Sequence, residues 1–199
     1  METLQQVYDY GVELYGKKNP NEFLEFTDKG TNHSYIDTYQ QLFNQYNNNL
    51  RLLEIGVQTG GSLWLWKTYL DNYDLWGVDI LPSYYLNRPF VPELNADSKI
   101  HTFWNRDSTI PETYNDVLGQ FDIISDDGNH HPDFQIKTFL ACNHKLAPNG
   151  TYVIEDVLLD AIQYIKDTLI SLQGPLDIDV HIGLKNGRYD DNIIKIKRK

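Results

Sequence analysis

Apolar residues recur along this chain with two different periods, and the change between them divides the sequence. In the first 46 residues they follow helical spacing, which predicts one helix over Leu4–Tyr15 and a second over Tyr35–Tyr46, capped by Ser34. The three asparagines Asn47 to Asn49 then indicate a turn. From about residue 50 onward, short apolar runs alternate with amphipathic segments, a pattern typical of strands alternating with helices.

Seven apolar runs are expected to be strands, at residues 52–56, 75–78, 100–104, 121–125, 151–154, 178–182 and 193–196. Amphipathic segments between them predict helices at residues 62–70, 111–118, 132–146 and 159–172. Strands joined by helices pair in parallel through right-handed crossovers, whereas Asn186-Gly187 between the last two runs is a hairpin signal. We therefore expect an α/β fold with a mostly parallel seven-stranded sheet and an antiparallel C-terminal strand.

Length and composition limit the classes of protein that this chain can represent. Its 199 residues, 41% of them hydrophobic, fit a single domain over residues 1–199, with a helical cap (1–49) before the core (50–199). A formal charge of -11 argues against a nucleic-acid partner, because phosphate binding requires clustered Lys and Arg. The single Cys142 fits a reducing compartment, and no secretory or membrane-spanning pattern is seen. We expect a cytoplasmic protein without a membrane partner, in which the aromatic N-terminal helices could serve a homo-oligomer.

The carboxyl ends of parallel strands are where open α/β sheets bind their ligands. After the first strand, Gly56 and Gly60 permit a tight turn, and a helix beginning near Ser62 offers free N–H groups. Such turns also occur for packing reasons alone, so by itself this one is weak evidence for a cofactor loop. Asp79 ends the second strand and could accept hydrogen bonds from a ribose diol or cap a turn. Asp107 follows the third, where it could receive a base amino group or cap a helix.

Acidic residues and a histidine follow the fourth and fifth strands. Asp127 and His130 lie in one loop, and Glu155 and Asp156 lie in the next. If these strands are neighbours, the carboxylates converge and require a hard cation such as magnesium, beside which His130 could act as general base. Each motif alone fits solvated loop acids and a helix-capping histidine. Their joint occurrence at two strand ends favours a metal-assisted site.

Five stretches in order resemble a known family: "TDKGTNHSYIDTYQQLF", "LLEIGVQTGGSLWLW", "WGVDI", "FDIISDDGNHHPDFQIKTF" and "LAPNGTYVIEDV". They are similar to S-adenosylmethionine-dependent, magnesium-dependent sugar O-methyltransferases of macrolide tailoring and to the related cephalosporin-hydroxylase-type methyltransferases. The resemblance runs from about Phe26 to Val157 and implies a Rossmann-like class I methyltransferase fold. The aspartate-glycine-histidine loop and the glutamate-aspartate pair are its most specific parts, since many class I methyltransferases share the glycine loop.

The resemblance also implies a role for particular residues. Asp127, Glu155 and Asp156 would bind Mg²⁺, and His130 would take the proton from a sugar hydroxyl. A second histidine, His131, directly follows His130, so either residue could be the base. Alignment with the family motif favours His130. Asn129 stands where the family usually has serine. Contacts with the cofactor S-adenosylmethionine are implied for Thr27, Lys29, Glu54, Gly56, Gly60, Ser62, Asp79, Asp107 and Asp126.

The expected function is transfer of a methyl group from S-adenosylmethionine to a hydroxyl of a sugar or glycosylated small molecule. The alternative is a catalytically inactive protein that keeps the fold and cofactor pocket and binds a partner; the clustered charge argues against it, because buried charge is costly without a use. Four aromatic residues could stack on a sugar ring, although we expect the tryptophans to pack in the core. They are Trp64, Tyr84, Tyr85 and Trp104.

Overall fold

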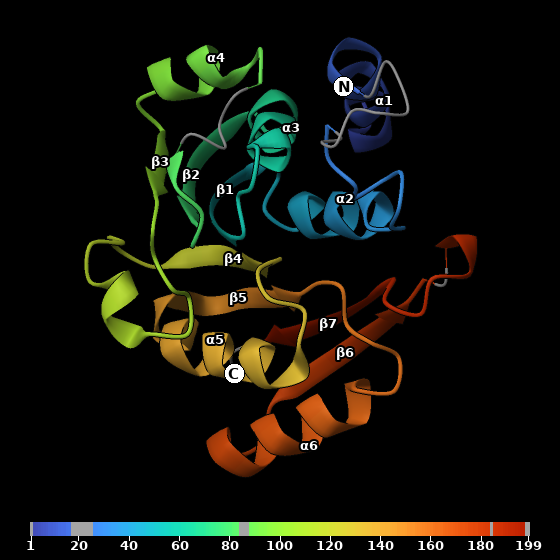
Figure 1. Ribbon diagram of the computed structural model, residues 1–199, viewed down its shortest axis with the longest axis vertical. Helices are drawn as coiled ribbons and strands as arrows, with labels where there is room; N and C mark the ends of the chain where they lie inside the picture. Colours follow the sequence, from blue (N-terminus) through green and yellow to red (C-terminus); the bar gives the residue numbers. More distant parts are fainter. Residues whose placement is uncertain (1, 17–25, 84–87, 184, 198–199) are drawn as a thin grey trace.

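The fold is built on one seven-stranded sheet, seen in the computed structural model of Figure 1, which describes residues 2–16, 26–83, 88–183 and 185–197. The strand order is β3-β2-β1-β4-β5-β7-β6, and β7 alone runs antiparallel to its neighbours. The strands are β1 (Asn49–Ile55), β2 (Asn72–Val78), β3 (Ile100–Phe103), β4 (Phe121–Asp126), β5 (Leu146–Ile154), β6 (Asp177–Ile182) and β7 (Asn192–Lys197). The predicted α/β class and the seven strands are confirmed. The predicted antiparallel C-terminal strand is also confirmed: it is β7, which lies between β5 and β6.

Helices cover both faces of the sheet. Figure 1 shows α1, α2 and α3 on one side and α5 and α6 on the other. The helices are α1 (Leu4–Tyr15), α2 (Ile36–Asn44), α3 (Gly61–Tyr69), α4 (Val91–Ala96), α5 (Pro132–Cys142) and α6 (Ile162–Gln173). Among the residues that the structure describes, no helix combines the length and the apolar character needed to cross a bilayer.

Two apolar clusters form the core because strand side chains alternate between the faces. Leu52 of β1 packs with α1, α2 and α3, whereas the next residue, Leu53, packs with α5 and α6. Trp64 is buried in the first cluster and Trp104 packs against it, so the expected core packing of both tryptophans is confirmed. The other two candidates for sugar stacking, Tyr84 and Tyr85, lie outside the described residues.

Several predicted element boundaries were wrong, each for a local reason. The helix expected over residues 111–118 is only a 3-10 turn, η2 (Pro111–Tyr114), because Asn115 and Asp116 favour turns over helix continuation. The helix expected over residues 132–146 ends at Cys142, and after a short 3-10 turn, η3 (Asn143–Lys145), Leu146 already pairs with β4. The six-residue α4 was not predicted, since so short a segment shows no periodicity.

Ser34 does not cap α2, contrary to the prediction. The N-cap is Tyr35, which makes no side-chain capping bond. The Ser34 hydroxyl instead donates to Asp191 Oδ2 at 2.9 Å, and its amide donates to Oδ1 at 2.7 Å. A buried carboxylate far away in the sequence therefore binds the groups that a local cap would have used.

Strand order reverses at β1, which pairs with β2 on one side and β4 on the other. From β1 the chain proceeds through β2 to β3 in one direction, and through β4 to β5 in the other. Such a switch point leaves a crevice beyond the carboxyl ends of the two central strands, where α/β proteins bind ligands. The acids singled out in the sequence follow these strand ends.

Candidate functional site

A cavity of about 550 Å³ lies beyond the carboxyl ends of the central strands. Gly56 after β1 and Asp79 after β2 line one part of it, with Asp107 from the loop after β3. Asp127 after β4 and Asp156 after β5 also line it. The structure thus brings residues from five strand ends around one cavity, as the sequence predicted for this edge of the sheet.

The glycine loop after β1 makes two close backbone approaches. Gly56 has φ +89°, and a Cβ there would overlap the backbone of Asp127, so β1 and β4 can approach only with glycine at this position. Gly60, with φ +83°, precedes α3. A Cβ on Gly61 would overlap the carbonyl of Phe26, which places the loop that includes Thr27 against the N-terminus of α3.

Asp79 and Asp107 each bind nearby main-chain groups while they line the cavity. Asp79 accepts from the amides of Gln58 and Leu81 at 2.6 and 2.7 Å, which fixes its carboxylate. Asp107 accepts from the amide and the hydroxyl of Thr109 at 2.9 and 2.7 Å. Asp79 therefore caps a turn, whereas Asp107 binds within its own loop and caps no helix, because the N-cap of η2 is Ile110. The free lone pairs of these oxygens remain available to a ligand.

Glu54, the second-last residue of β1, is a buried carboxylate without a hydrogen bond from any described residue. Among the described residues none donates to either oxygen, although the Lys29 ammonium lies 3.8 Å away and the Ser62 hydroxyl is also near. Burial raises the pKa of Glu54 to about 7, against the opposing effect of Lys29 and Ser62. A carboxylate with unused acceptors fits the ammonium group of a methionine moiety.

Lys29 lies at the centre of the buried acids. Its Nζ is 2.9 Å from Asp127 Oδ2 and 2.8 Å from both Glu155 oxygens, with the side chain only 1% exposed. Burial lowers its pKa, but the attraction of Asp127 and Glu155 outweighs burial and holds it well above the usual value. Glu155 also accepts from the hydroxyls of Tyr39 and Ser125. Glu155 does not line the cavity, which distinguishes it from Asp127 and Asp156.

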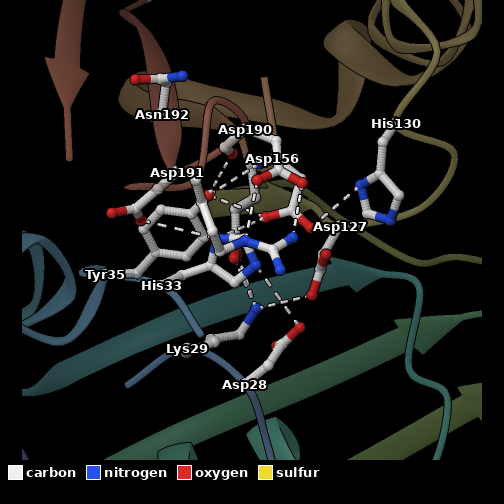
Figure 2. Close-up of polar contacts among 12 residues, drawn as sticks. Asp28, Lys29, His33, Tyr35, Asp127, His130, Asp156, Asp190, Asp191 and Asn192 are labelled. Carbon is white, nitrogen blue, oxygen red and sulfur yellow. Dashed lines mark hydrogen bonds and ion pairs between the residues drawn. The ribbon is translucent and has the colours of Figure 1, made fainter. Parts of the chain in front are cut away.

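Asp127, His130 and Asp156 form a group whose potential ligand atoms lie within 4.8 Å of one another. His130 Nδ1 is 3.4 Å from Asp156 Oδ2 (Figure 2). The histidine lines the cavity, and its side chain is 48% exposed. Burial raises the pKa of both aspartates, and the nearby Glu155 raises them further. Carboxylates that resist ionisation in this way suit a hard divalent cation such as Mg²⁺.

The two adjacent histidines have different surroundings. His131 is the N-cap of α5, where its Nδ1 accepts from the amide of Asp133 at 3.3 Å. His130 instead lines the cavity beside Asp156. The capping role considered for a histidine here therefore belongs to His131, and the geometry leaves His130 as the candidate base.

Six of the nine residues expected at the cofactor are not among those that line the cavity: Thr27, Lys29, Glu54, Gly60, Ser62 and Asp126. Asp126 points to the opposite face of the sheet, where Tyr152 donates to its Oδ2 at 2.9 Å and burial raises its pKa to about 7. Thr27 lies in the loop against α3, and its carbonyl accepts from the Tyr8 hydroxyl at 3.4 Å. Because β4 side chains alternate, Asp126 and Ser125 must face opposite ways.

His33 and Tyr35 were missed as site residues in the sequence. Tyr35 donates to Asp156 Oδ1 at 2.8 Å, and His33 Nδ1 lies 3.4 Å from the same oxygen (Figure 2). Asp28, from the same polar loop, lines the cavity. The only signal in the sequence is that this loop, "TDKGTNHSY", carries more specific side chains than a simple connection needs.

Comparison with known proteins gives relatives of one chemical class. The chain is 33% identical over 141 residues to mycinamicin VI 2''-O-methyltransferase of Micromonospora griseorubida, covering 66% of this chain and 34% of that protein. It is 31% identical over 139 residues to 8-demethyl-8-alpha-L-rhamnosyl tetracenomycin-C 2'-O-methyltransferase of Streptomyces olivaceus, covering 66% and 35% respectively. The chain spans about one third of the length of these relatives. No protein-family model matches it.

Solved structures give the same fold. The MycE methyltransferase of the mycinamycin biosynthetic pathway, in complex with Mg, SAH and mycinamycin VI, superposes with a TM-score of 0.69 at 22% identity, covering 98% of this chain and 54% of MycE. A putative caffeoyl-CoA O-methyltransferase from Staphylococcus aureus superposes with a TM-score of 0.63 at 16% identity, covering 100% and 93%. The resemblance predicted from the motifs is thus confirmed: this chain has the Rossmann-like class I methyltransferase fold and is related to the sugar O-methyltransferases of macrolide and tetracenomycin tailoring.

Proposed function

We propose that the protein transfers a methyl group from S-adenosylmethionine to a hydroxyl of a sugar or glycosylated small molecule, with the assistance of Mg²⁺. One observation carries the proposal: a single cavity is lined both by the strand ends typical of cofactor binding, at Gly56 and Asp79, and by the group of Asp127, His130 and Asp156. The relatives named above are O-methyltransferases that act on sugars.

The residues present fit the cofactor. The two acceptors of Glu54 without hydrogen bonds suit the methionine ammonium group, and Asp79 is held by backbone amides in an orientation that suits a ribose diol. Asp107 lies farther along the same cavity. A sulfonium carries positive charge, so a cavity lined by several carboxylates favours it electrostatically.

The residues also fit a divalent cation. Asp127 and Asp156 would hold Mg²⁺, with Glu155 as a third ligand if its carboxylate exchanges the Lys29 ammonium for the metal. When bound, the cation supplies charge that lowers the pKa of an acceptor hydroxyl. His130 is then placed to remove the hydroxyl proton at Nδ1 or Nε2, while Asp156 stabilises the imidazolium that results. Thr27 to Gly30 would help to close the site over the cofactor.

Turnover tests this function directly. The protein is incubated with S-adenosylmethionine and a panel of glycosylated macrolides and aromatic polyketides with free sugar hydroxyls, with Mg²⁺ or with EDTA, and methylated products are detected by mass spectrometry. We expect a product that requires Mg²⁺. A protein that binds S-adenosylhomocysteine yet methylates no sugar, alone or with added divalent metal, would favour the inactive binding protein.

Other expectations from the sequence stay predictions. They are the single domain with its cap at residues 1–49, the cytoplasmic location, the absence of a nucleic-acid partner, and a homo-oligomer formed through the N-terminal helices. Packing of Leu4 of α1 and Phe43 of α2 in the same apolar cluster as the sheet supports the single domain.

A further inference from the structure

Tyr35 contacts Asp156 at two points. Its hydroxyl donates to Asp156 Oδ1 at 2.8 Å and accepts from the Asp156 backbone amide at 3.1 Å. Asp156 has φ +53°, in the left-handed region that residues other than glycine rarely adopt. One hydroxyl can bind both groups only when the side chain and the amide of Asp156 point the same way. Tyr35 therefore stabilises the unusual backbone conformation and the rotamer together.

His33 lies close to the same carboxylate oxygen, although its Nδ1 makes no hydrogen bond to any described residue. Its ring stacks on Tyr35, with centroids 4.8 Å apart and planes 23° apart, and the side chain is 1% exposed. His33 Nδ1 lies 3.4 Å from Asp156 Oδ1 and 3.6 Å from Asp191 Oδ1 (Figure 2). The polar atoms of both side chains therefore lie close to Oδ1 of Asp156. The other oxygen, Oδ2, faces His130.

Another buried acid, Asp191, binds the segment that carries both rings. Asp191 accepts from the amide and hydroxyl of Ser34, which lies between His33 and Tyr35 in the sequence, and from the amide of Lys185 at 2.6 Å. Asp191 directly precedes β7, which pairs with β5, the strand that Asp156 follows. The two rings are therefore attached to the same part of the sheet as the carboxylate that they contact.

We propose that Tyr35 and His33 are positioning residues that hold Asp156 with Oδ1 turned into the protein and Oδ2 turned toward the bound cation and His130. The inference rests on the proposed function, because it assigns Asp156 to the metal. A carboxylate held in one rotamer loses less conformational entropy on binding a metal, and partners that orient a ligand typically contribute about 10- to 100-fold to metal affinity.

The test is a titration with Mn²⁺, a probe for Mg²⁺ sites, followed by electron paramagnetic resonance of the free ion in the presence of S-adenosylhomocysteine. Tyr35→Phe keeps the stacked ring and removes only the hydroxyl. We expect Mn²⁺ affinity to fall about 10- to 100-fold, with S-adenosylhomocysteine affinity unchanged. Tyr73→Phe is the matched control, because it removes a hydroxyl that donates to Asp97 at 2.6 Å elsewhere in the fold. Its Mn²⁺ affinity should equal that of the wild type.

A second pair of variants covers the case in which Tyr35→Phe does not fold. His33→Asn keeps an N–H near the position of Nδ1, whereas His33→Leu removes it. We expect His33→Leu to weaken Mn²⁺ binding and His33→Asn to retain most of it.

Mn²⁺ affinity equal to that of the wild type in Tyr35→Phe, or equal affinities in the two His33 variants, would overturn the positioning role while the metal-assisted function stands. A wild-type protein that binds no Mn²⁺ would contradict the metal-assisted function, and the positioning role with it.

Discussion

Replacing Lys29 with methionine should destabilise the protein strongly, because it removes an ammonium that contacts two fully buried acids and the partly exposed Asp127. The Nζ atom is 2.8 Å from Glu155, 2.9 Å from Asp127 and 3.8 Å from Glu54. At an effective dielectric constant of about 20, each contact supplies about 4 to 6 kcal/mol of attraction, which desolvation of the ammonium and the acids largely offsets. Removing one member of a buried ion pair typically costs about 3 to 5 kcal/mol, and we expect Lys29→Met to lie in this range.

The loss of unfolding free energy in Lys29→Met should depend on pH. Burial already raises the pKa values of Asp127 and Glu54, and Lys29 opposes that rise. Without Lys29 these carboxyls should have still higher pKa values in the folded state, so stability is present at low pH and is lost as pH rises through those values. Lys29→Met should therefore lose less stability at about pH 5 than at about pH 8.

Urea unfolding at both pH values measures the deficit. The control is Lys67→Met, because Lys67 pairs at 2.6 Å with Glu93, whose side chain is 52% exposed. Such a surface pair contributes at most about 1 kcal/mol. A deficit in Lys29→Met no larger than that of the control, or one that does not change with pH, would refute the assignment of Lys29 as the cation of this buried cluster.

Three further predictions concern the site. His130→Ala should lower kcat for sugar methylation about 100- to 10,000-fold without changing S-adenosylhomocysteine affinity. In contrast, His131→Ala should cost only about 1 kcal/mol of stability through the lost helix cap; equal kcat losses in the two variants would contradict the assignment. Gly56→Ala should cost about 2 to 5 kcal/mol and abolish cofactor binding measured by calorimetry, because overlap with the backbone of Asp127 adds to the strain of a positive φ. Gly187→Ala, with φ +75° and open space around it, should cost only about 1 to 2 kcal/mol, and equal costs would contradict the overlap argument. Burial raises the pKa of Glu54 to about 7, so the free energy of unfolding of the ligand-free protein should fall as pH rises from about 4 to 7, and Glu54→Gln should flatten that slope in urea unfolding.

The sheet and the polar edge of the fold were predictable because local patterns determine them. Strand runs such as Leu52 to Gly56 and Phe121 to Ser125 are short, apolar and bounded by turn residues, and parallel pairing places their carboxyl ends together. That was sufficient to expect Asp79, Asp127 and Asp156 around one cavity, as the structure has them.

Contacts between distant segments were not predictable from local patterns. The amide and hydroxyl of Ser34 bind Asp191, at a separation of 157 residues, so its local capping signal was misleading. Lys29 was expected at the cofactor, yet it pairs with Asp127 and Glu155, about a hundred residues away in sequence. Periodicity reports the face of an element on which a residue lies. It does not report which charged group from another segment meets that residue.

Asp126 illustrates the limit within a single motif. In the sequence, Asp126 and Asp127 are equivalent neighbours, and both were expected in the site. Asp126 is the last residue of β4 and accepts from Tyr152 on the face covered by α5 and α6, whereas Asp127 lies beyond the strand and lines the cavity. A shift of one residue in the strand end would exchange their roles, and strand ends are the least certain part of a pattern.

The central claim is that one cavity binds both the cofactor and a divalent cation. Calorimetric titration of the protein with S-adenosylhomocysteine and then with Mg²⁺, repeated on Asp127→Asn, tests it most directly. We predict that the wild type binds both ligands and that the variant keeps the cofactor and loses the metal. A wild-type protein that does not bind S-adenosylhomocysteine would contradict the account.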